Sequence, residues 1–103
     1  MSETLAPPKP KLEFIVAPEL EPPYHVFIHN DDITPMDFVV RVLQSVFELL
    51  LERAEAVMLT AHYSGVALVG TYPREDAQRR VENAHQLARL ENYPLKFTLE
   101  PAE

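Results

Sequence analysis

Proline is concentrated at the N-terminal end of this chain, and that distribution limits where regular structure can form. Six of the ten prolines lie within residues 1–23, namely Pro7, Pro8, Pro10, Pro18, Pro22 and Pro23. Proline fixes φ and lacks a backbone N–H, so a segment this rich in proline favours extended or polyproline II backbone over helix. The sequence therefore predicts a disordered N-terminal arm over residues 1–23 and one folded domain over residues 24–103.

The remainder of the chain alternates between strand and helix patterns. β-Branched and aromatic runs predict strands over residues 24–29, 66–72 and 95–100. Apolar residues at helical spacing, with proline and glycine at the boundaries, predict helices from residue 35 to about 50, from 52 to about 64 and from 73 to about 92. The expected buried stripes are Val39, Val42, Leu43, Val46, Phe47 and Leu50 in the first helix, and Ala77, Val81, Ala84 and Ala88 in the third.

This order of elements, β-α-α-β-α-β, predicts a fold of the α+β class. We expect a small sandwich in which a three-stranded, mainly antiparallel sheet packs against three helices on one face. A chain of 103 residues has room for one modest core of this kind.

Composition excludes several classes of protein. A net charge of −7 argues against a nonspecific nucleic-acid binder and against attraction to an anionic membrane. No apolar run reaches the roughly 20 residues that span a bilayer, and the first residues show no secretory signal. Without cysteine there is no disulfide, thiolate nucleophile or Cys-based zinc site. We expect a cytoplasmic protein.

The segment 30–36 carries the clearest functional signal. Asn30, Asp31 and Asp32 place an amide beside two carboxylates directly after a predicted strand. Thr34 is expected to cap the following helix, with Asp37 completing an approximate capping box. Oxygen acceptors displayed on an anchored turn suit recognition of a cation.

A second signal lies near the end of the helix predicted over 52–64. Met58 and His62 are four residues apart and so share a helix face, and Gly65 follows as the expected end of the helix. Each feature alone has a plainer explanation: the turn as a helix-cap cluster, the methionine as core, and the histidine as a cap for terminal carbonyls.

Taken together, these residues resemble the ClpS family, small adaptors that deliver substrates to the bacterial Clp protease. The resemblance covers residues 24–100 and includes the turn at 30–36, residues 52–54, the Met58/His62 helix end with Tyr63 and Gly65, then Gly70 and residues 93–95. It implies an adaptor domain over residues 24–103. Such a domain binds N-degron substrates, whose N-terminal residue is Leu, Phe, Tyr or Trp, and delivers them to a ClpA- or ClpC-type AAA+ unfoldase.

The resemblance also implies the residues that bind substrate. An N-terminus is a cation at neutral pH, since the α-amino pKa is about 7.7–8.0, and Asn30, Asp32 and His62 would accept its hydrogen bonds. Asp31 would add negative potential or contact the substrate backbone. The first side chain would enter an apolar pocket, with Thr34 at its rim, formed by Met36, Val39, Met58, Ala61 and Leu95.

A second surface is implied for the unfoldase. Glu75 and Arg80 match positions that bind the N-terminal domain of ClpA, and the N-terminal arm is expected to engage the unfoldase pore. One alternative is an interaction module that modulates the unfoldase without recognising N-termini.

A small metal-dependent hydrolase is the other alternative, because carboxylates and a histidine are present. However, His25 and His29 are expected on one face of a strand and His85 on the third helix, so no compact cluster of histidines is implied. The chain has only two glycines and no glycine-rich loop that could bind phosphate. We therefore expect a binding protein with no enzymatic activity, no metal and no cofactor.

Overall fold

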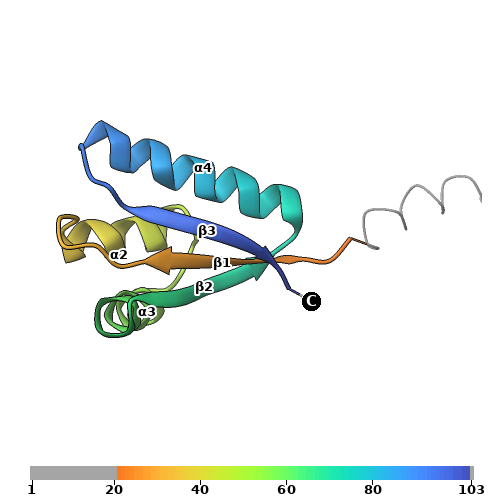
Figure 1. Ribbon diagram of the computed structural model, residues 1–103, viewed down its shortest axis with the longest axis horizontal. Helices are drawn as coiled ribbons and strands as arrows, with labels where there is room; N and C mark the ends of the chain where they lie inside the picture. Colours follow the sequence, from red (N-terminus) through yellow and green to blue (C-terminus); the bar gives the residue numbers. More distant parts are fainter. Residues whose placement is uncertain (1–20, 103) are drawn as a thin grey trace, which may run out of the picture.

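The structure is a computed structural model in which residues 21–102 are described. Its elements are β1 (Tyr24–His29), α2 (Met36–Ser45), α3 (Leu51–Ser64), β2 (Val66–Tyr72), α4 (Arg74–Leu90) and β3 (Lys96–Pro101) (Figure 1). This succession confirms the predicted order. The predicted arm lies almost wholly outside the described residues, so both the arm and its boundary at residue 23 stay predictions.

The central strand of the sheet is β1, which pairs antiparallel with β2 on one side and β3 on the other. Successive strand residues point to opposite faces, so Val26 and Ile28 share one face while Phe27 lies on the other. Ile28 pairs with Ala67 of β2 and Phe97 of β3, and all three are buried. The predicted antiparallel α+β sheet is therefore confirmed.

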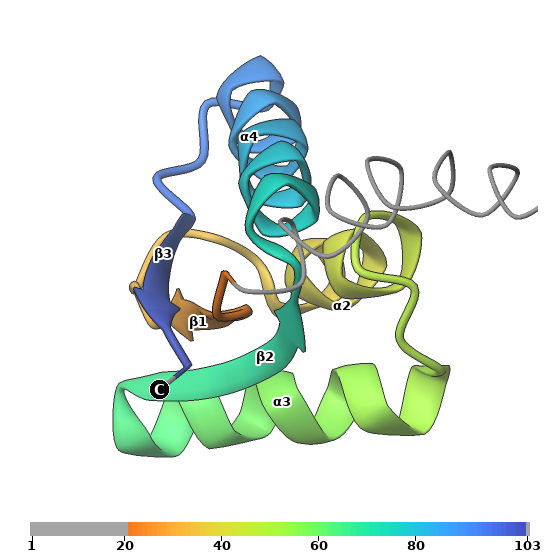
Figure 2. The same ribbon diagram turned by 90° about the vertical axis from the view of Figure 1, so that its right-hand side faces the viewer.

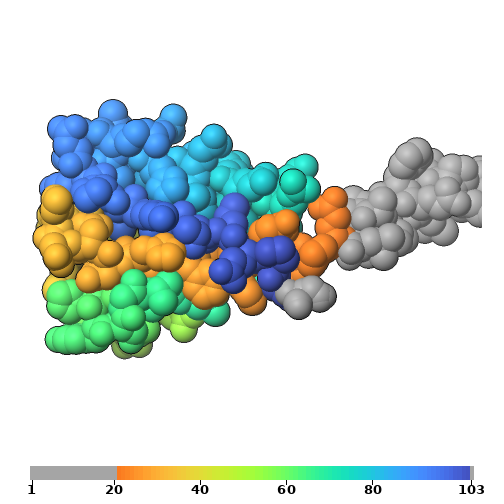
Figure 3. Space-filling model, viewed as in Figure 1, coloured from red at the N-terminus to blue at the C-terminus, as the bar shows by residue number. Residues whose placement is uncertain are grey.

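The three helices cover the buried face of the sheet. Figure 2 shows α4 and α3 on either side of α2. The opposite sheet face, which is turned toward the viewer in Figure 3, carries no helix in the described part of the chain. In α4 the buried residues are Ala77, Val81, Ala84 and Ala88, as predicted. Their small side chains let the helix backbone approach the sheet closely.

The first helix is shorter than predicted, because α2 ends at Ser45 instead of continuing to about residue 50. Glu48 has a positive φ of 59°, and the Leu49 N–H donates to the Leu43 carbonyl oxygen at 3.2 Å. Leu50 was expected in the buried stripe but is 81% exposed and stands at the start of α3. The left-handed residue after this helix is a glutamate, a residue type that rarely adopts that conformation. The sequence therefore lacked the glycine that usually indicates a helix end.

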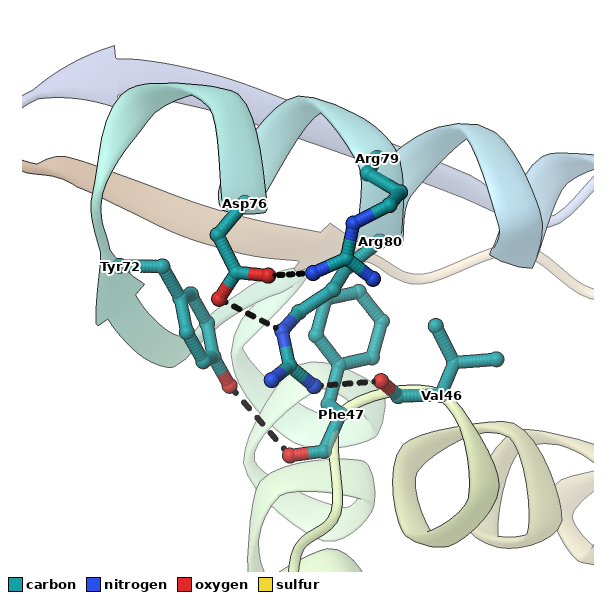
Figure 4. A network of polar contacts seen from close by, with 6 residues as sticks. All are labelled: Val46, Phe47, Tyr72, Asp76, Arg79 and Arg80. Carbon is teal, nitrogen blue, oxygen red and sulfur yellow. Dashed lines mark hydrogen bonds and ion pairs between the residues drawn. The ribbon is translucent and has the colours of Figure 1, made fainter.

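The end of α2 is held by contacts with α4 and β2 (Figure 4). The Arg80 Nε donates to Asp76 at 3.0 Å, and an Arg80 terminal nitrogen donates to the Val46 carbonyl oxygen at 2.7 Å. The guanidinium also lies 4.8 Å from the centre of the Tyr72 ring, a cation–π contact. The Tyr72 hydroxyl donates to the Phe47 carbonyl oxygen at 3.5 Å. These contacts fix the end of α2 against the other two elements.

The outer edge of β3 is protected by a side chain of α4. The Phe97 N–H donates to His85 Nε2 at 3.0 Å, so this nitrogen must be unprotonated. Burial lowers the pKa of His85 below its ordinary value, and the positive charge of Arg89 lowers it further. The neutral ring thus satisfies a backbone donor that an edge strand would otherwise leave unpaired.

Candidate functional site

The turn between β1 and α2 is organised by Asp31. Its Oδ1 accepts hydrogen bonds from the backbone N–H groups of Ile33 at 2.8 Å and Thr34 at 2.7 Å, and its Oδ2 accepts one from the Thr34 hydroxyl at 2.9 Å. Aspartate commonly stabilises turns through such bonds. The predicted capping box of Thr34 and Asp37 is wrong, because α2 begins after Pro35 with no side-chain cap.

A backbone hydrogen bond connects this turn to the end of α3. The Asn30 N–H donates to the Gly65 carbonyl oxygen at 3.0 Å. Gly65 ends α3 with a φ of 93°, a conformation that suits glycine, and the predicted helix end is confirmed there. The bond brings the last turn of α3, which carries His62, beside Asn30 and Asp32.

The turn, α2, α3 and Leu95, which directly precedes β3, line a hollow of about 310 Å³. This volume lies at the lower end of the range of about 300–1,000 Å³ typical of ligand pockets. All ten residues predicted to bind substrate line it, namely Asn30, Asp31, Asp32, Thr34, Met36, Val39, Met58, Ala61, His62 and Leu95. The structure therefore brings together residues from four separate segments of the chain.

The hollow is apolar in its interior and polar at its rim. Val39, Ala61 and Leu95 are buried and form the floor, whereas Met36 is 45% exposed and forms part of the mouth. Asn30, Asp32 and His62 are exposed and present acceptors beside that mouth. The hollow can therefore take an apolar group whose attached end is a hydrogen-bond donor.

The orientation of His62 is influenced by its neighbour. The His62 and Tyr63 rings meet edge to face, with centroids 4.9 Å apart and planes at 79°. Such a pairing is a preferred arrangement of aromatic rings. Tyr63 is thus an aromatic neighbour of the histidine that lines the hollow.

The hollow is also lined by four residues that were not predicted from the sequence, namely Ile28, His29, Ile33 and Pro35. Ile28 and His29 end the central strand immediately before Asn30, and Ile33 and Pro35 belong to the turn itself. Their closeness in sequence to the predicted residues was the signal that could have identified them.

The two residues predicted to contact the unfoldase differ in accessibility. Glu75 is exposed in the first turn of α4. The Arg80 side chain is only 15% exposed and uses its donors within the molecule. The role of both residues in partner binding stays a prediction.

Two negative findings concern the described residues. Within 21–102 no three histidine or acidic side chains are grouped so that they could hold a metal ion. Over the same range, no helix has the length and apolar character needed to cross a membrane.

A comparison with protein families matches residues 19–98 to one described as the ATP-dependent Clp protease adaptor protein ClpS. The chain belongs to the ClpS family. Its members are adaptors of the Clp protease, which confirms the prediction that this protein is an adaptor and not an enzyme.

Relatives and a solved structure agree with this assignment. The chain is 48% identical over 87 residues to a ClpS of Xanthomonas campestris, covering 82% of each chain. It is 47% identical over 79 residues to that of Desulforapulum autotrophicum, covering 77% of this chain and 76% of the relative. The structure of Agrobacterium tumefaciens ClpS2 bound to L-phenylalaninamide superposes with a TM-score of 0.75 at 39% identity, covering 78% of this chain and 96% of that one.

Proposed function

We propose that this ClpS-family protein binds the N-terminal residue of N-degron substrates and delivers them to the Clp protease. The preferred first residues are Leu, Phe, Tyr and Trp. Delivery passes through a AAA+ unfoldase of the ClpA or ClpC type, in the cytoplasm. The observation that carries the proposal is the position of Asn30, Asp32 and His62 at the mouth of an apolar hollow.

The chemistry of the hollow fits both parts of an N-terminal residue. An α-ammonium has three donors and no acceptor, and the rim offers an amide oxygen, a carboxylate and an imidazole nitrogen. The first side chain would enter the floor lined by Val39, Ala61 and Leu95. Phenylalaninamide, the ligand named for the Agrobacterium relative, combines the same two features, an α-amino group and an apolar side chain.

The expected affinity follows from these groups. Hydrogen bonds to a charged partner contribute about 1.5–3 kcal/mol each, and burial of a Leu or Phe side chain contributes about 1.5–3 kcal/mol. Association opposes this gain with a cost of at least about 4 kcal/mol. At its upper limit this balance leaves a binding free energy near −8 kcal/mol, which corresponds to the micromolar dissociation constant that we expect.

Fluorescence anisotropy with a labelled peptide that begins with Phe tests the proposal. The free peptide should bind at micromolar concentration, and its N-acetylated form should bind at least about a hundredfold more weakly, because the charge and two donors are lost. Equal binding of the two peptides would falsify the proposal and would favour an interaction module that ignores N-termini.

A pair of histidine variants sharpens the same experiment. His62→Ala should weaken binding of the free peptide by at least about tenfold, because it removes one acceptor of the ammonium. His25→Ala is the matched control, since His25 lies on the sheet face away from the helices and bonds to Thr71. It should leave the affinity unchanged.

A further inference from the structure

A second groove lies between α2 and α3, beside the hollow described above. It has a volume of about 570 Å³ and is lined by Met36, Asp37, Val40, Arg41, Glu55, Met58 and Leu59. Met36 and Met58 line both spaces, so the groove and the hollow meet at these two side chains.

We propose that this groove binds the side chain of the third residue of the substrate and favours an apolar residue there. The inference rests on the proposed function, because it requires the first residue to fill the adjoining hollow. A substrate held in this way continues as a polypeptide from the mouth of the hollow, which Met36 forms in part, and Met36 also lines the groove.

The spacing of the groove fits the third residue. Val40 lies four residues beyond Met36 on α2, which is about 6 Å along the helix axis. Glu55 lies one turn before Met58 on α3, so it flanks the groove opposite α2. In an extended peptide the first and third side chains point to the same side and are about 6.6 Å apart, whereas the second points away.

The lining of the groove suits an apolar side chain with polar surroundings. Val40 and Met58 are half-buried and pack against the core, while Leu59 is 43% exposed. Asp37, Arg41 and Glu55 are exposed at the rim, where they stay hydrated beside an occupied groove. An apolar third residue would cover Leu59 and the mouth-facing part of Met36, both of which are otherwise in contact with water.

The test compares peptides that differ in one position. Two peptides begin Phe-Ser and continue with Leu or with Ser; a third begins Phe-Leu-Ser. We expect the peptide with Leu in third place to bind about fivefold more tightly than the other two, since an open groove buries part of a leucine side chain. Isothermal titration with the full chain measures these affinities, with phenylalaninamide as the reference ligand for the hollow.

A matched pair of surface variants assigns the effect to the groove. In Leu59→Ser, the peptide with Leu in third place should bind about as tightly as the one with Ser there, so that the fivefold preference is lost. The affinity for phenylalaninamide should stay unchanged. The control is Leu90→Ser, at a leucine of α4 that is 77% exposed and does not line the groove. It should retain the preference.

Other outcomes overturn the inference in distinguishable ways. If phenylalaninamide binds but the three peptides bind equally, the third-residue site is wrong and the proposed function stands. If phenylalaninamide does not bind, both fail. If Leu59→Ser keeps the preference but converts a dimer to a monomer in sedimentation, or slows degradation by the protease, the groove belongs to a second copy or to the unfoldase.

Discussion

At the scale of single residues, the carboxylates of the turn have different roles. Asp31 accepts three hydrogen bonds from its own turn and so holds the backbone in place. Asp32 is exposed at the mouth of the hollow and makes no side-chain hydrogen bond to the described residues. Asp31 thus acts on the site by positioning its neighbours.

Met36 provides a prediction about selectivity. It lies at the mouth of the hollow. A first residue branched at Cβ carries an extra methyl group at that mouth, and we expect this group to clash with the Met36 side chain. Met36→Ala should therefore improve binding of peptides that begin with Ile or Val relative to Leu. Competition binding measures the Ile-to-Leu affinity ratio, and a ratio equal to that of the wild type would rule out this role of Met36.

His85 provides a prediction about pH. Because its pKa is lowered in the folded state, His85 resists protonation there more than in the unfolded chain. Its contribution to the free energy of unfolding is present above the unfolded pKa of about 6.5 and is lost as pH falls through the lower folded value. His85→Gln should flatten the dependence of stability on pH between about 7.5 and 5, as measured by urea unfolding.

The amide oxygen of that glutamine can still accept a hydrogen bond, so the variant separates protonation from loss of an acceptor. His85→Leu, which removes the acceptor, should be less stable than His85→Gln at pH 7.5. A His85→Gln curve parallel to that of the wild type would show that another group causes the pH dependence.

At the scale of elements, Arg80 joins α4 to the end of α2 by its bond to the Val46 carbonyl oxygen. Arg80→Gln should lower the free energy of unfolding by about 2 kcal/mol, the typical loss for a largely buried charged hydrogen bond. Arg79→Gln is the matched control, because Arg79 pairs with the same Asp76 but is 63% exposed. Its effect should stay below about 1 kcal/mol in chemical unfolding. Equal effects of the two variants would contradict the role of Arg80.

At the scale of the whole molecule, the proline-rich arm is expected to serve delivery of substrate. It lies almost wholly outside the described residues, and its proposed role comes from the family resemblance. Twenty extended residues could reach on the order of 60 Å at about 3.1 Å per residue. Deletion of residues 2–20 should leave peptide affinity unchanged but strongly slow degradation of a reporter that begins with Phe.

The degradation assay should be run with the adaptor saturating, so that binding does not limit the rate. Reporter turnover at the full-length rate would then show that the arm is dispensable. A parallel loss of peptide affinity would instead mean that the deletion damages the binding domain.

The amino-acid sequence by itself determined the features that depend on near neighbours. The bounds of β1 and β2 follow from β-branched and aromatic runs, and the face of α4 follows from alanines at helical spacing. The family resemblance supplied the residues of the candidate site, and the structure places all ten of them around one hollow.

The tertiary structure decided what depends on residues distant in the chain. The end of α2 lies at Ser45 because Arg80 and Tyr72 bind the carbonyl groups that follow it, and those partners come from α4 and β2. Likewise, the groove proposed to bind the third substrate residue exists only because α2 and α3 pack side by side. Such contacts join residues tens of positions apart, so local spacing and propensity do not specify them.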